Sequence, residues 1–154
     1  MTRIAVLSDS HDATGMLELV AQFIAAREYD HVFHLGDMVG DAKRLSERLD
    51  RKVLFVAGNC DFFSRDAREI EVKVGGVRML LAHGDKYGVK SSLAKLSYHA
   101  EELHCAVALF GHTHVPFSGY VGNALLVNPG ALQAGRFAEL EIENGKAVPR
   151  LLRL

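Results

Sequence analysis

Seven side chains that can coordinate a metal ion stand close behind short apolar runs of this 154-residue chain. Carboxylate, amide and imidazole groups all suit a divalent cation of borderline hardness, and no thiol is among the seven. Seven donors exceed what one tetrahedral ion requires, so we expect two ions that share a bridging carboxylate. Two ions about 3.5–4 Å apart form a clamp for in-line displacement at phosphorus. The pattern therefore predicts metal-assisted hydrolysis of a phosphate ester, and the seven donors are Asp9, His11, Asp37, Asn59, His83, His112 and His114.

Local spacing supports a shared site. Asp9 and His11 are separated by one residue, as are His112 and His114. In an extended segment such a pair points to one side, where it can share or flank an ion. Asp37 is the expected bridge, as the lone carboxylate at the end of a strand that we place centrally. Glycines beside four of the donors would let the backbone approach closely or adopt conformations that a side chain forbids. These glycines are Gly36, Gly58, Gly84 and Gly111.

Short runs rich in Val, Leu and Ile predict the buried strands that must position these residues. Five of them each end at a polar cluster that contains one or more of the donors: Ile4–Leu7, Val32–Leu35, Val53–Ala57, Val77–Ala82 and Ala106–Phe110. Further expected strands are Glu71–Val74, Phe117–Val121, Ala124–Val127, Phe137–Ile142 and Ala147–Leu152. Ligands of open α/β sheets bind beyond the carboxyl ends of the strands, so we expect the five clusters to converge on one rim.

A helical period predicts three helices, over Met16–Arg27, Asp41–Leu49 and Lys90–Leu103, with Asp41 as the N-cap of the second. Strands and helices alternate in the first half of the chain, and strands alone fill the last third. This order predicts a single mixed α/β domain over residues 1–154. Its helices would lie outside, with parallel strands first and antiparallel hairpins after.

Composition limits the class of protein. The chain has 18 Lys and Arg against 19 Asp and Glu, which argues against binding nucleic acid or acidic lipid by bulk charge. No apolar run approaches the roughly 18 residues of a membrane helix, and the N-terminus lacks a signal-peptide core. Cys60 and Cys105 are too few for a disulfide scaffold. We therefore expect a cytoplasmic protein without a membrane partner.

The ordered set Asp9-x-His11, Gly36-Asp37, Gly58-Asn59-x-Asp61, His83-Gly84 and Gly111-His112-x-His114 resembles the calcineurin-like metallophosphoesterase superfamily. The small size, Cys60 after Asn59 and the loop Asn128-Pro129-Gly130 are similar to its YfcE-like branch of compact phosphodiesterases. The resemblance implies a four-layer α/β/β/α sandwich of two mixed β-sheets flanked by helices. It covers most of the chain, since the motifs span positions 9 to 130 in the order of the family.

The resemblance also implies how the donors divide between the ions. Asp9, His11, Asp37 and His114 would hold one ion, and Asp37, Asn59, His83 and His112 would hold the other. A hydroxide that bridges both would attack phosphorus, and Asn59, His112 and Asp37 would be the catalytic residues. Manganese is the expected metal, while nickel, iron, zinc, cobalt and magnesium are alternatives. A small phosphodiester is the expected substrate, and exposed strand edges favour a homodimer.

One departure from the family bears on the substrate. Many larger members have His directly after the metal-binding Asn, where it is thought to protonate the leaving group, and this chain has Cys60. A thiol with a pKa near 8.5 matches that task less well than imidazole, so we favour diesters over monoesters. The alternatives are a phosphomonoesterase acting on nucleotides or phosphometabolites, and a non-catalytic protein-interaction module of the same fold.

Several neighbours of the donors are open to two interpretations. His34 either orients a ligand or is a hydrogen-bonded strand residue. Asp61 and Asp85 either orient ligands or cap loops. For Phe62 and Phe63 we favour packing of their loop onto the domain over a pocket wall that stacks on an aromatic leaving group.

Overall fold

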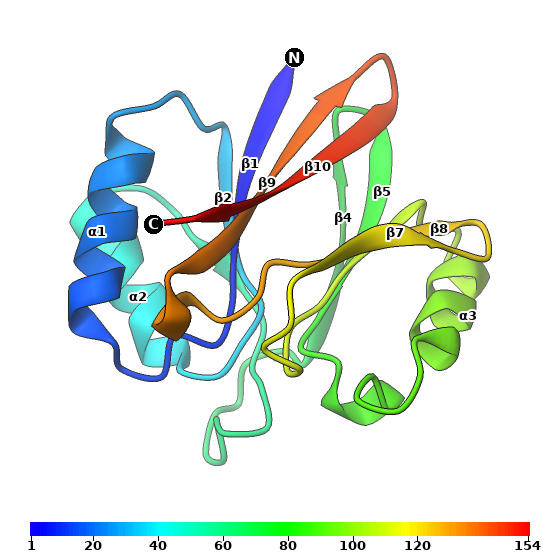
Figure 1. The fold of residues 1–154 in the computed structure, drawn as a ribbon, viewed down its shortest axis with the longest axis horizontal. Coiled ribbons are helices and arrows are strands. Elements are labelled where there is room, and N and C mark those ends of the chain that lie inside the picture. The colour runs from blue at the N-terminus through cyan, green and yellow to red at the C-terminus, as the bar shows by residue number, and fades with distance from the viewer.

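The structure is a computed structural model that describes every residue from 1 to 154. Two five-stranded mixed sheets pack face to face, and helices cover both outer faces. Helices α1 (Thr14–Ala25) and α2 (Val39–Leu49) lie against one sheet, and α3 (Ala94–Glu102) lies against the other (Figure 1). This arrangement confirms the expected α/β/β/α sandwich.

The first sheet has the strand order β10-β9-β1-β2-β3. Its strands are β1 (Thr2–Leu7), β2 (His31–His34), β3 (Leu54–Phe55), β9 (Arg136–Glu143) and β10 (Lys146–Arg153). β1, β2 and β3 run parallel, whereas β9 and β10 form an antiparallel hairpin beside β1. Parallel pairing brings the carboxyl ends of β1, β2 and β3 to the same edge.

The second sheet has the strand order β4-β5-β6-β8-β7. Its strands are β4 (Glu69–Val74), β5 (Val77–Ala82), β6 (Val107–Leu109), β7 (Phe117–Val121) and β8 (Ala124–Asn128). β5, β6 and β8 run parallel, and β4 and β7 close the two edges as antiparallel hairpins. The parallel pair β5 and β6 presents its carboxyl ends together.

Alternation along the strands divides the core into layers. Ile4 and Val6 of β1 join the cluster between the sheets, while Ala5 and Leu7 join the cluster beneath α1 and α2. β1 is buried on both faces, so its sequence is almost continuously apolar. This apolar run is what allowed the strand to be predicted from the sequence. Leu96 of α3 is buried in a third cluster on the outer face of the second sheet.

The start of α2 corrects the prediction that Asp41 is its N-cap. The helix begins at Val39, and Met38 occupies the N-cap position with a φ of 89°. The backbone N–H groups of Met38 and Val39 both donate to the carboxylate of Asp61 at 3.0 Å. Asp41 lies inside the first turn, where it accepts the N–H of Asp12 at 3.0 Å. The helix is capped by a distant segment, so local spacing could not reveal its start.

Some predicted elements are shorter in the structure. β3 keeps only Leu54–Phe55 of the expected run, and the N–H of Ala57 instead donates to the carbonyl of Ala67 at 2.9 Å. The third helix begins at Ala94 rather than Lys90, since the chain before it forms turns. None of the helices has the length and hydrophobicity that spanning a lipid bilayer requires.

Candidate metal centre

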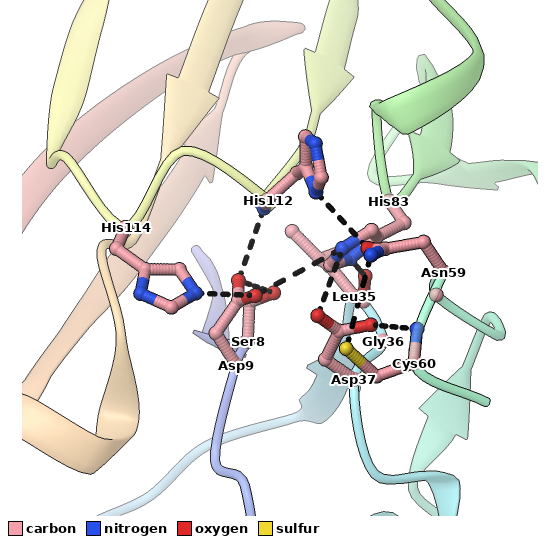
Figure 2. A network of polar contacts seen from close by, with 12 residues as sticks. Ser8, Asp9, Leu35, Gly36, Asp37, Asn59, Cys60, His83, His112 and His114 are labelled. Carbon is pink, nitrogen blue, oxygen red and sulfur yellow. Dashed lines mark hydrogen bonds and ion pairs between the residues drawn. The ribbon is translucent and has the colours of Figure 1, made fainter. Parts of the chain in front are cut away.

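The polar clusters meet at one edge of the sandwich, as their positions behind the strands predicted. Asp9, Asp37 and Asn59 follow β1, β2 and β3 of the first sheet, while His83 and His112 follow β5 and β6 of the second. Figure 2 shows the side chains of these residues directed toward a common region. The site therefore lies across the junction of the two sheets.

Asp9 is buried and uses its two carboxylate oxygens differently. Its Oδ2 accepts the hydroxyl of Ser8 at 2.6 Å and the backbone N–H of His112 at 3.1 Å. Its Oδ1 faces imidazole nitrogens, with Nε2 of His114 at 3.1 Å and Nε2 of His11 at 3.7 Å. One oxygen is thus fixed by the protein, and the other remains directed into the cluster.

Asp37 shows the same division. Its Oδ1 accepts the backbone N–H of Cys60 at 2.9 Å. Its Oδ2 lies 3.3 Å from Nε2 of His83 and 3.7 Å from Nε2 of His11. A single oxygen of Asp37 therefore faces two histidines whose loops follow strands of different sheets.

Asn59 and His112 are arranged differently from the other donors. Nδ1 of His112 lies 3.0 Å from Oδ1 of Asn59, so these two side chains contact each other. The ring of His112 stands edge-on to that of His83, with 5.1 Å between the centroids. The structure thus gathers the other five donors into one cluster with this pair beside it, and those five are Asp9, His11, Asp37, His83 and His114.

Three buried polar atoms of the cluster have no hydrogen-bond partner: Oδ1 of Asp9, Nε2 of His11 and Nε2 of His83. Nδ1 of His83 lies 2.8 Å from the carbonyl of Leu35, which can only accept, so Nδ1 donates and Nε2 of the neutral ring keeps its lone pair. Buried polar groups nearly always find a partner. Converging lone pairs without one fit a divalent cation.

A sequence profile described as the calcineurin-like phosphoesterase superfamily domain matches residues 2–143. The chain belongs to the calcineurin-like phosphoesterase superfamily. The probable metallophosphoesterase YsnB of Bacillus subtilis is 32% identical, over 96% of this chain and 88% of that protein. The phosphodiesterase YfcE of Escherichia coli is 27% identical, over 86% of this chain and 80% of that protein.

Two solved structures share the fold of this chain. A Streptococcus pneumoniae protein described as a predicted phosphoesterase has a TM-score of 0.82 at 29% identity, covering 99% of this chain and 89% of that one. Vps29 of Entamoeba histolytica, in complex with zinc, has a TM-score of 0.76 at 18% identity, covering 99% of each chain. The second likeness shows the fold alone.

The loops of this phosphoesterase correct the prediction that its donor pairs lie on extended backbone. The φ angles are positive at Asp9 (54°), His11 (45°), His112 (70°) and His114 (63°). Each loop reverses the chain tightly after its strand, so the alternation of an extended segment does not apply. The close ring contacts instead join different loops, with the rings of His11 and His114 5.3 Å apart.

Two glycines are required by close approach at the site. A Cβ on Gly111 would lie 2.1 Å from Oγ of Ser8 and 2.6 Å from Oδ2 of Asp9. A Cβ on Gly58 would lie 2.2 Å from Oδ1 of Asp37. Any side chain at either position would displace a carboxylate of the cluster, as the spacing of the glycines predicted.

Asp61 combines the two roles left open for it. Its carboxylate accepts N–H groups at the start of α2, and it also accepts the N–H of Asp37 at 3.0 Å and that of Gly58 at 2.8 Å. It therefore fixes the loop of Asp37 against the loop of Asn59 while capping the helix. Asp85 makes no hydrogen bond to any of the seven donors and begins a short 3-10 helix, Asp85–Tyr87.

His34 makes no hydrogen bond to any of the seven donors. Its ring is fully buried, and Nδ1 accepts the N–H of Gly36 at 3.2 Å. Nε2 lies 2.9 Å from the hydroxyl of Ser10 and donates to it. His34 thus connects β2 to the loop that carries Asp9 and His11.

The surroundings shift the pKa values of the donors. Burial favours the neutral form of Asp37, but His83 and the N–H of Cys60 outweigh it, so the pKa of Asp37 falls below its usual value. Burial likewise lowers the pKa of His83, but the carboxylates of Asp37 and Asp9 raise it above its usual value. Burial, followed by the nearby His83, lowers the pKa of His112. The Asp37 carboxylate is therefore ionised at neutral pH.

Two features next to the cluster were missed or misjudged from the sequence. The Cys60 thiol lies close enough to His11 and Asp37 for the three to form a possible ligand group, although the predicted donors contained no thiol. Phe62 and Phe63 are 78% and 99% exposed, which contradicts the expectation that their loop packs onto the domain. We expected packing because burial of aromatic rings is favourable. The sequence alone does not indicate that these two rings are exposed to solvent.

Proposed function

We propose that this chain is a phosphodiesterase that depends on two divalent metal ions. Asp37 would contact both ions, with Asp9, His11 and His114 completing one site. The residues Asn59, His83 and His112 would complete the other. The observation that carries the proposal is the convergence of buried, unpartnered atoms of Asp9, His11 and His83.

The proposed reaction is in-line attack of hydroxide at phosphorus. Such a pair of ions, when bound, lowers the pKa of coordinated water and draws negative charge from the phosphoryl oxygens. The backbone N–H of Cys60 holds Oδ1 of Asp37, which leaves Oδ2 directed toward His11 and His83, where it would coordinate the metal. The contact between Asn59 and His112 supports a joint role for them in stabilising charge that develops on phosphorus.

The preference for diesters rests on Cys60. The thiol occupies the position after Asn59 where an imidazole would be better suited to protonate a leaving group. A diester that releases an acidic leaving group depends less on such a proton donor. The phosphodiesterase name of YfcE, a relative with 27% identity, supports the same preference.

The proposal also includes the metal, the substrate, the cellular location and the oligomeric state. Manganese is the proposed metal, since mixed oxygen and nitrogen ligation suits it, although nickel, iron, zinc, cobalt and magnesium also accept such donors. A small phosphodiester is the proposed substrate. A cytoplasmic location and a homodimer are further proposals, supported by the two free cysteines and by the exposed edge strands.

The deciding experiment measures bound metal and turnover in the same samples. Chelator-treated protein would be reloaded with Mn²⁺, its metal content measured by mass spectrometry, and its rates compared on bis-p-nitrophenyl phosphate and phenyl phosphate. We expect manganese-dependent hydrolysis that favours the diester. Asp37→Ala should lose metal and activity together, whereas His31→Ala, an exposed residue at the opposite end of β2, should keep both.

Other results would support an alternative function or refute the site. Faster hydrolysis of the monoester would identify a phosphomonoesterase. Stoichiometric metal without turnover of either ester would support a non-catalytic interaction module. An Asp37→Ala protein with full activity would refute the assignment of the site.

A further inference from the structure

The segment that follows Asn59 projects from the edge of the molecule that carries the metal cluster. In Figure 1 it is the teal loop between β3 and β4 that extends below the sandwich. Phe62 and Phe63 lie in this loop and are 78% and 99% exposed. Two adjacent phenyl rings in water forgo the free energy of burial, which a ligand that covers them would recover.

This loop lines a pocket that adjoins the candidate metal centre. The pocket has a volume of about 510 Å³, within the range of small-molecule sites. Cys60 forms part of its wall, and the N–H of Cys60 donates to Oδ1 of Asp37 at 2.9 Å. Met38, the residue after Asp37, lines it as well. A group bound there would therefore lie next to a phosphorus held at the metal centre.

The charged side chains of the pocket leave one cation unpaired. Lys43 and Arg65 line the pocket together with Asp61 and Asp66. The carboxylate of Asp61 already accepts four backbone N–H groups, and that of Asp66 lies 3.8 Å from Nζ of Lys43. Arg65 is exposed and makes no ion pair. One guanidinium without a counter-ion thus stands beside two exposed aromatic rings.

We propose that the pocket of Phe62, Phe63 and Arg65 binds one ester arm of the substrate, a flat aromatic group that carries negative charge, such as the base and phosphate of a nucleotide. The rings supply stacking surface for the aromatic group, and the guanidinium supplies its charge partner. This inference rests on the proposed function, because it places the phosphorus at the metal centre. It names the class of substrate that the phosphodiesterase would prefer.

Phosphonates that the enzyme cannot hydrolyse test the subsite through binding alone. Calorimetric titration of the manganese-loaded protein would compare methylphosphonate, phenylphosphonate and 4-carboxyphenylphosphonate. We expect phenylphosphonate to bind about tenfold more tightly than methylphosphonate, the effect of one stacked ring. The double variant Phe62→Ser, Phe63→Ser should abolish this difference. Arg65→Ala should abolish only the extra affinity that the carboxyl group adds.

Tyr98→Ser is the matched control, since Tyr98 is an aromatic residue of α3 that is 64% exposed and lies outside this pocket. It should leave all three affinities unchanged. A double variant that retains the phenyl preference would overturn the proposal while leaving the phosphodiesterase intact. A double variant that changes the oligomeric state but not the affinities would show that the rings form a protein interface, and would also overturn it. If the unsubstituted protein neither binds manganese nor hydrolyses the diester, the proposed function itself is refuted.

Discussion

Nε2 of His83 lies 3.3 Å from Oδ2 of Asp37, although the two residues belong to loops of different sheets. His83 follows β5 of the second sheet, and Asp37 follows β2 of the first. The two sheets otherwise meet through apolar side chains between them. A cation held by both residues would therefore connect the sheets at one edge, and the site would contribute to stability as well as to chemistry.

Chelation should for this reason lower the melting temperature of the protein. A ligand that binds only the folded state at a concentration of 100 Kd stabilises it by about 2.7 kcal/mol. For a chain of this size that corresponds to a rise of about 5–10 °C with Mn²⁺ over EDTA. Circular dichroism melts in the two buffers measure the difference. Asp37→Ala should melt at the same temperature in both, and equal melting temperatures for the unsubstituted protein would contradict a metal that bridges the sheets.

Gly111→Ala should weaken metal binding without removing any ligand. The added methyl would overlap Oγ of Ser8 and Oδ2 of Asp9, so the Asp9 carboxylate must move. We expect at least a tenfold loss of manganese affinity and a cost of about 1–3 kcal/mol in unfolding free energy. Competition with a fluorescent chelator measures the first quantity and urea denaturation the second.

Gly15→Ala is the matched control for that substitution. Gly15 lies in α1, and a Cβ there meets no atom within 4 Å. Alanine should leave metal affinity unchanged and stabilise the helix by about 0.5 kcal/mol. If both variants bind manganese normally, the backbone of Gly111 does not position Asp9.

The fold and the composition of the site could be predicted because each leaves a local trace. Strands such as β1 are buried on both faces, so their sequences are apolar without interruption, and the polar residues that end them are conspicuous. Parallel strands of one sheet end at a common edge, so the convergence of Asp9 and Asp37 followed from their order. His83 follows a strand of the other sheet, and its approach to Asp37 depends on how the two sheets pack.

The features that were missed depend on contacts between distant segments. Asp61 caps α2 from a loop more than twenty residues away, so the helix begins before Asp41. His112 has a left-handed backbone conformation, and its N–H donates to the carboxylate of Asp9, more than one hundred residues away in the chain. Local sequence patterns do not predict such a contact. The exposure of Phe63 could not be predicted either, because the hydrophobicity of a phenyl ring favours burial at any position.

Cys60→His should shift the enzyme from diesters toward monoesters. An imidazole beside Asn59 would supply a proton donor with a pKa near neutral, which a monoester with a basic leaving group requires. General acid catalysis contributes typically 10²–10⁴-fold, so we expect the ratio of monoester to diester turnover to rise by about tenfold or more. Initial rates on p-nitrophenyl phosphate cannot show this, since that leaving group is acidic, and phenyl phosphate and bis-p-nitrophenyl phosphate are the informative pair. Cys60→Ser controls for loss of the thiol, and an unchanged ratio in Cys60→His would remove Cys60 as the reason for a diester preference.

His34 should make the stability of the protein depend on pH. Burial lowers its pKa to about 4, against 6.5 for an exposed imidazole. Nδ1 already accepts the N–H of Gly36, so a proton added there would face another donor. The unfolded chain therefore binds a proton at a higher pH than the folded chain does. The contribution of His34 is fully present above pH 6.5 and is lost as the pH falls toward 4.

Between pH 7 and pH 5 this loss amounts to about 2 kcal/mol of unfolding free energy. Urea denaturation of chelator-treated protein at the two pH values measures it without competition from metal binding. His34→Gln retains an acceptor for Gly36 and a donor for Ser10 but has no titrating group. Its stability should fall by about 2 kcal/mol less than that of the unsubstituted protein over the same interval. Parallel losses in the two proteins would show that His34 is solvated or charged in the folded state, which its burial in the structure contradicts.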